Sequence, residues 1–210
     1  MGGTAKTPPA GHLFMTNENC EKLAEKKAQG FHHMIARLLH LCRRTRKDIQ
    51  MAVAFLCTRV KNPNTDDYKK LSCVIKYLRG TQDLMLMIET GEHPSWWVDS
   101  SYSEHPDMCS HSGICMTLGK GVAYSRSSKQ KLNTKSSTEA ALIALEDTMG
   151  QVLWTHHFLA EQGQYVPTTT ICQNNKSIIL LAENGRTSSC KQTWHLNVRY
   201  YFVTDQIKKG

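Results

Sequence analysis

The sequence predicts a mixed α/β domain in its second half, preceded by a small helical segment. Three observations carry this prediction. Residues 96–125 hold three short stretches with the two-residue alternation of strands, residues 136–160 have the spacing of a long helix, and residues 168–172 form a β-branched stretch before another helical pattern. This order predicts a mixed sheet of three antiparallel strands followed by a parallel strand, with flanking helices.

The first predicted strand, residues 96–102, carries an acidic residue. Val98 lies between Trp97 and Asp99, which share the opposite face of the strand. A carboxylate on a central strand costs free energy unless it is paired or bound to a metal. The next two strands, residues 113–118 and 122–125, are joined by a tight hairpin at residues 119–121.

The long helix at residues 136–160 has an acid in its first turn. Ser136 and Glu139 fit a capping box, and Gly163 is placed to end the helix. Glu139 and Asp99 can converge on one point, where two carboxylates could hold a divalent metal ion. After the strand at 168–172, Asn174 and its neighbour open a helix that Gly185 stops, and residues 194–205 resume helical spacing.

The first half of the chain is expected to be helical. Residues 1–28 are polar and are predicted to be a mobile lead-in, and residues 31–41 form the first helix. Asp48 is expected to cap a second helix, and Asp66 or Asp67 to start a third helix that Gly80 stops. A short strand is predicted at residues 84–88, and a domain boundary divides residues 29–92 from 93–210.

Composition bounds the function. Residues 1–95 carry 15 Lys+Arg and 9 Asp+Glu, a net charge of +6, whereas residues 96–210 carry 11 and 9, a net charge of +2. The positive charge of the first half predicts binding to the phosphate backbone of nucleic acid. A basic protein surface with no such partner would have the same composition. No run of apolar residues is long enough for a membrane span. Without an export signal, an intracellular site in a cytoplasmic particle or the nucleus is expected, with the eight cysteines reduced.

Short motifs in the second half carry a family resemblance. In order, they are Val98–Tyr102, Ser110–Gly113, Tyr124–Gln130, Ser136–Ala140, Gln173–Ser177 and His195–Phe202. They resemble the ribonuclease H domain of Ty1/copia-type retrotransposon Pol polyproteins. Residues 45–53 and 77–81 resemble the segment that links the reverse transcriptase, through its thumb or connection, to that domain. The polymerase's own catalytic aspartates would lie upstream.

The resemblance implies a ribonuclease H-like fold and a two-metal hydrolysis of RNA in RNA–DNA hybrids. Mg²⁺, which Mn²⁺ can replace, would bind four acids, and Asp99 and Glu139 occupy the first two positions. Asn174 and Asn197 stand at the third and fourth. His195 would act near the phosphate or in product release, or is an ordinary helix residue. The implied partners are a hybrid or other nucleic acid and an upstream reverse transcriptase domain.

The two asparagines predict an impaired nuclease, because each amide keeps an oxygen ligand but lacks a negative charge. A second hypothesis is a module that binds nucleic acid without cutting it. A third is a decayed gene remnant with no selected role. Glu139 could also serve only as a helix cap.

Overall fold

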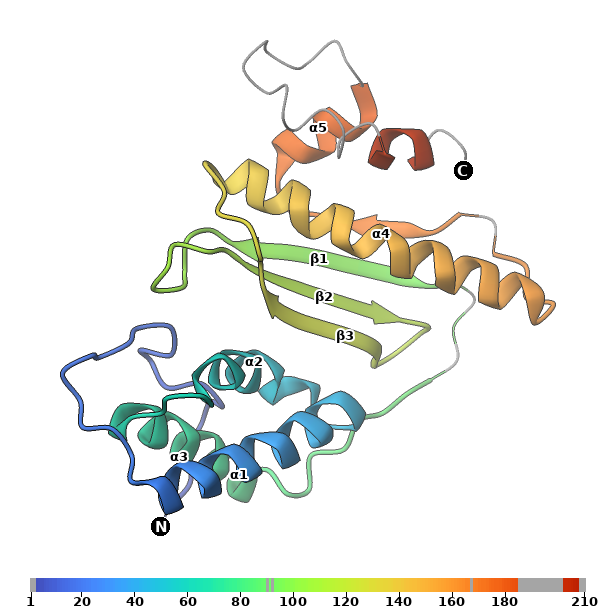
Figure 1. Cartoon of the computed structure of the whole chain (residues 1–210). Coiled ribbons are helices and arrows are strands. Elements are labelled where there is room, and N and C mark those ends of the chain that lie inside the picture. The colour runs from blue at the N-terminus through green and yellow to red at the C-terminus, as the bar shows by residue number, and fades with distance from the viewer. Residues whose placement is uncertain (1–2, 90, 92, 167, 185–201, 208–210) are drawn as a thin grey trace. The chain divides into compact units, whose positions relative to one another are not determined.

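The computed structural model describes residues 3–89, 91, 93–166, 168–184 and 202–207 (Figure 1). The chain divides into two compact units. The first comprises residues 1–86 with 105–107 and 127–129, and the second comprises residues 87–104, 108–126 and 130–210. The predicted boundary at residue 92 lies a few residues beyond this division.

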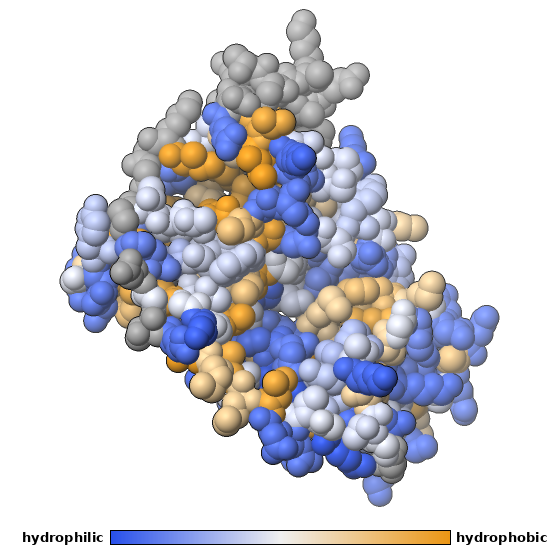
Figure 2. Space-filling view, turned by 180° about the vertical axis from the view of Figure 1, so that it is seen from behind, coloured by the Kyte–Doolittle hydropathy of each residue, from blue (hydrophilic) through white to orange (hydrophobic). Residues whose placement is uncertain are grey.

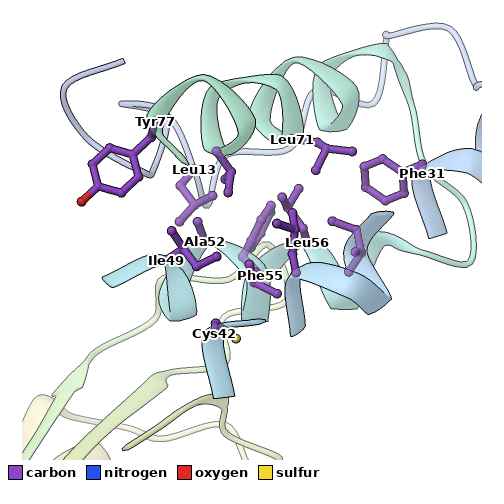
Figure 3. Packing of buried hydrophobic residues seen from close by; sticks show 13 residues of the cluster. Leu13, Phe31, Cys42, Ile49, Ala52, Phe55, Leu56, Leu71 and Tyr77 are labelled. Atoms are coloured by element: carbon purple, nitrogen blue, oxygen red, sulfur yellow. The ribbon is translucent and has the colours of Figure 1, made fainter. Parts of the chain in front are cut away.

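The first unit is built on three helices, α1 (Glu25–Arg44), α2 (Gln50–Arg59) and α3 (Thr65–Gly80), with a 3-10 turn, η1 (Lys47–Ile49), before α2. Helix α1 begins six residues before the start predicted from periodicity. Its buried residues recur at three- and four-residue steps and meet the apolar sides of α2 and α3 (Figure 3). The buried set is Leu13, Phe31, Ile35, Leu38, Cys42, Ile49, Ala52, Val53, Phe55, Leu56, Leu71, Val74 and Tyr77.

Two helix starts differ from the sequence prediction. Asn64, not Asp66 or Asp67, caps α3: its side chain accepts hydrogen bonds from the backbone N–H of both aspartates, at 3.0 and 2.9 Å. Asp67 completes the capping box by accepting from the Asn64 N–H. Asp48 caps nothing, because its carboxylate pairs with Arg46 at 2.8 Å.

Residues before α1 make specific contacts with the helices. Leu13 is buried in the core, and the Lys70 ammonium donates to the Met15 carbonyl. Lys22 forms an isolated antiparallel bridge with Asn64.

The strand predicted at residues 84–88 is absent. Leu84, Met85, Met87 and Ile88 are all more than half exposed, and residues 84–89 adopt no regular structure. A strand needs a partner, and this stretch makes one backbone hydrogen bond to the turn at residues 118–121, from the Glu89 N–H to the Lys120 carbonyl. Alternation alone was therefore misleading here.

The second unit contains a four-stranded sheet in the order β3-β2-β1-β4. Its strands are β1 (Ser95–Ser101), β2 (His111–Thr117), β3 (Val122–Lys129) and β4 (Thr170–Cys172). Strands β1 and β2 are antiparallel, whereas β4 runs parallel to β1. The predicted mixed α/β architecture, with three antiparallel strands and one parallel strand, is confirmed and is consistent with a ribonuclease H-like fold.

Helix α4 (Ser137–Glu161) lies along this sheet, and α5 (Lys176–Asn184) packs on α4 (Figure 1). Trp96, Ile114 and Met116 of the sheet meet Val152 of α4 in one buried cluster. A second cluster joins α4 to Ile178 of α5 and to Val203 in the helical residues 202–207. The predicted helix at 194–205 otherwise falls outside the described residues.

The end of α4 follows the sequence prediction. Gly163 has φ of +75°, a left-handed conformation that glycine adopts without a steric penalty. Its N–H donates to the Ala160 carbonyl at 2.9 Å, and the Gln164 N–H donates to the Leu159 carbonyl at 3.0 Å. These two bonds are the Schellman arrangement, and they satisfy carbonyls that the helix end leaves free.

The surface mixes hydrophilic residues with patches of hydrophobic ones (Figure 2). On α4, Trp154 and Phe158 are 59% and 47% exposed, and their rings stack at 5.1 Å between centroids. No helix in the described part of the chain is both long and apolar enough to cross a bilayer.

Candidate functional site

Asp99 lies near the end of β1 on its solvent-exposed face. Trp96 and Val98 are buried, whereas Trp97, Asp99 and Ser101 are exposed, as the alternation of the strand requires. Opposite Asp99 on β2 stands Gly113, beside which a Cβ atom would meet nothing within 4 Å. Asp99 therefore faces open space on the side of the sheet away from the Trp96 cluster that packs on α4.

Glu139 lies in the first turn of α4 and is buried, with 9% of its surface exposed. One carboxylate oxygen accepts a hydrogen bond from the Lys135 N–H at 2.6 Å, and the Ser136 hydroxyl accepts from the Glu139 N–H at 3.1 Å. Only half of the predicted capping box forms, because the carboxylate reaches the residue before the cap. An acid in this place is stabilised by the positive end of the helix dipole.

A buried polar cluster fastens the start of α4 to the sheet. The Gln130 amide nitrogen donates to the Ser112 hydroxyl at 2.8 Å and to the Ala140 carbonyl at 2.9 Å. Ser112 pairs with Ser100 across β1 and β2, so Ser100 takes the sheet face that looks toward Ala140. These bonds fix the turn that carries Glu139.

Sequence reasoning included Gln130 and Ser112 in motifs but gave them no role. Both are at most 4% exposed. The Gln130 carbonyl oxygen is buried and has no hydrogen-bond partner within the described residues. A polar residue just before a predicted helix was the available signal, but its partners are set by the sheet register.

The two asparagines after β4 differ in role. Asn175 is the cap of α5: its side-chain oxygen accepts from the Ser177 and Ile178 N–H groups, at 3.1 and 3.3 Å. Asn174 is exposed, and its N–H donates to the Gln173 side chain at 2.8 Å. The Asn174 side chain does not cap α5. Because β4 is adjacent to β1 in the sheet, Asn174 follows a strand that lies next to the one that carries Asp99. His195 and Asn197 lie outside the described residues.

The chemistry of the predicted donors suits a hard cation. Asp99, Glu139 and Asn174 would each bind a metal through an oxygen atom. The buried Gln130 carbonyl is a further oxygen near the start of α4. Mg²⁺ and Mn²⁺ prefer oxygen ligands to sulfur or imidazole. The described residues contain no group of three or more His, Cys, Asp or Glu side chains placed to hold a metal. Convergence of Asp99 with Glu139 stays a prediction, because Asp99 begins on the sheet face away from α4.

Known proteins resemble the chain over most of its length. It is 27% identical over 208 residues to the retrovirus-related Pol polyprotein from transposon TNT 1-94 of Nicotiana tabacum, covering 96% of this chain and 15% of that protein. It is 29% identical over 171 residues to the corresponding polyprotein from transposon RE2 of Arabidopsis thaliana, covering 79% of this chain and 12% of that protein. The RE1 polyprotein of the same plant is 28% identical over the same length.

The chain thus spans 12–15% of the length of these curated relatives. No protein-family model matches it, and no solved structure matches it. The relationship is consistent with a region of a copia-type Pol polyprotein, as the sequence motifs predicted.

Proposed function

Because the chain is related over most of its length to retrovirus-related Pol polyproteins of plant transposons, we propose that residues 93–210 form a ribonuclease H-type domain. Its reaction is the divalent-metal-dependent hydrolysis of RNA in RNA–DNA hybrids, impaired by the loss of two acids. Residues 29–92 are the segment that joins it to an upstream reverse transcriptase domain in an intact element.

One observation carries the proposal. The sheet order β3-β2-β1-β4, with an acid on the central strand β1 and another in the first turn of the helix that follows β3, is the arrangement that this reaction would use. The likeness to retrovirus-related Pol polyproteins of transposons supports a place for the chain in such a polyprotein.

Asp99, Glu139 and the Asn174 amide oxygen are the groups that would hold the metal. A bound divalent ion supplies Lewis-acid stabilisation of the phosphate and a more acidic water. The role of the chain is to orient it: the Gln130 bonds hold the α4 turn against β2, and the Lys135 N–H fixes the rotamer of Glu139. At an effective dielectric constant of about 20, replacing one acid by asparagine weakens the electrostatic attraction for the ion by roughly several kcal/mol.

Cleavage of a labelled RNA–DNA hybrid in Mg²⁺ or Mn²⁺ tests the proposal. We expect slow cleavage in the native chain, none in Asp99→Asn, and a gain of at least about tenfold when Asn174→Asp and Asn197→Asp are combined. Native turnover as fast as that of the restored variant would contradict the impairment. Absence of cleavage in every variant would contradict the nuclease assignment.

A second function, binding of nucleic acid without cleavage, is favoured by two placements. Asp99 lies on the exposed sheet face, and the Glu139 carboxylate already serves the helix start. Magnesium titration separates the two functions, because a nuclease site loses the ion when Asp99 or Glu139 is neutralised, whereas a binding module need not take up the ion at all.

A further inference from the structure

Helix α1 carries a basic stripe along its outward side. Lys26, His33, Arg37, His40 and Arg44 are all exposed. At 100° per residue, these five positions fall within about 40° of one line along the helix. The opposite arc buries Phe31, Ile35, Leu38 and Cys42. We call the five exposed residues the α1 ridge.

No carboxylate neutralises the ridge among the described residues. The ion pairs of the first unit lie elsewhere: Asp66 binds His12 and Lys70, Asp48 binds Arg46, Asp67 binds Arg59, and Asp107 binds Lys129. Glu25, the one acid on α1, lies about 100° around the helix from Lys26. Lys26, Arg37 and Arg44 are therefore like charges on one line, and a bound polyanion would offset their mutual repulsion.

We infer that the α1 ridge binds the phosphate backbone of a nucleic-acid duplex. This inference deepens the proposed function, since it names the surface that would hold the substrate outside the metal site. From residue 26 to residue 44 the helix rises about 27 Å. A duplex of that length presents about 16 phosphates, so the five ridge side chains, which all carry N–H donors, find partners without bending the nucleic acid.

The composition of the ridge favours nucleic acid over other polyanions. No large hydrophobic residue of α1 is among the exposed ones of the described chain, so the helix has no apolar edge to insert into a lipid headgroup layer. Protein interfaces centre on buried aromatic anchors, and the ridge offers no Trp, Tyr or Phe. Guanidinium groups alternating with imidazoles suit a row of phosphates.

Two of the five ridge positions, His33 and His40, are exposed histidines. The His32 ring stacks on His33 with 6.3 Å between ring centroids, and Arg37 and Arg44 each follow a ridge histidine by one helical turn. No ion pair reaches either histidine from another described element.

Fluorescence anisotropy with the full chain and a hybrid of about 20 base pairs, in EDTA, tests the inference. Because each phosphate contact contributes about −0.9 to the slope of log K against log salt, K26Q/R37Q/R44Q should reduce that slope by about 2.7 at pH 8. The matched control K61Q/K69Q/K76Q removes the same net charge from other parts of the first unit and should leave most of the slope. Circular dichroism checks that both variants fold.

The histidines form a second arm of the test. H33Q/H40Q should weaken binding to the hybrid at pH 8, because it replaces two side chains that lie on the line of the ridge, and circular dichroism checks that this variant folds. Equal losses in the ridge and control variants would overturn the inference, as would binding to phosphatidylserine vesicles but not to the hybrid. Since the assay contains no metal and measures no cleavage, failure of the nuclease proposal leaves its outcome unaffected.

Discussion

The most informative perturbation is Glu139→Gln, because it separates a metal ligand from a helix cap. Glutamine keeps an oxygen that can accept from the Lys135 N–H but removes the negative charge. All four tryptophans lie between residues 96 and 194, in the second unit, so their fluorescence reports the unfolding of that unit alone.

The structure gives the size of the structural effect. The 2.6 Å bond to Lys135 changes from charge-assisted to neutral, which lowers its contribution by about 1 kcal/mol. Loss of the favourable helix-dipole interaction adds about 0.5 kcal/mol. Ser136→Ala is the matched control, because it removes the acceptor of the Glu139 N–H, costs about 1 kcal/mol and keeps the carboxylate.

The assay is urea unfolding with and without Mg²⁺ at about ten times its dissociation constant, which calorimetry on the native chain supplies. Binding at that concentration stabilises the folded state by about 1.4 kcal/mol. We expect this gain in the native chain and in Ser136→Ala, but none in Glu139→Gln. An equal magnesium gain in all three would refute the ligand role, as would no binding to the native chain, and Glu139 would then be a cap only.

Three further predictions concern the frame that carries the sites. Trp96→Ala should destabilise the second unit by about 3–5 kcal/mol, since the side chain is fully buried, whereas its neighbour Trp97, 44% exposed, should tolerate alanine with a much smaller loss; urea unfolding followed by fluorescence decides. Asn64→Ala should lower the thermal stability of the first unit by about 1–2 kcal/mol, followed by circular dichroism, while Asn64→Asp keeps the cap and most of the stability. Burial opposes ionisation of Asp66, but hydrogen bonds from Lys70 and a histidine outweigh it and hold the pKa of Asp66 below its usual value. The Asp66 carboxylate therefore contributes its full share to the free energy of unfolding above the pKa of an unfolded Asp, near 4, and loses it as the pH falls through the lower pKa of the folded state. The free energy of unfolding of Asp66→Asn should therefore fall less steeply than that of the native chain below about pH 5, measured by urea unfolding at several pH values.

Periodicity located the elements with strong patterns. The buried positions of α4, the glycine that ends it and the hairpin between β2 and β3 follow from local spacing and backbone freedom. The helix starts were predicted less well, because several neighbouring polar residues could each cap the same helix. Asn64, Asp66 and Asp67 are all plausible caps, and the geometry of the turn gives that task to Asn64.

The candidate site divides in the same way. The motifs named Asp99, Glu139 and Asn174, and the sheet order places their elements next to one another. The motifs could not show that Gln130 joins Ser112 to the Ala140 carbonyl, since those three residues are 18 and 10 positions apart in the chain. Nor could they show that the Glu139 carboxylate is held by Lys135.

By itself, the sequence determined the succession of strands and helices, the basic character of the first half and the presence of amides where acids were expected, because these depend on residue type and local spacing. Only the tertiary structure decided that residues 84–88 lack a strand partner, that Asp99 takes the open face of β1 and that the α1 ridge is exposed and has no ion pair with a carboxylate among the described residues. Each of these depends on which distant segments pack together, and burial and ion pairing are properties of that packing.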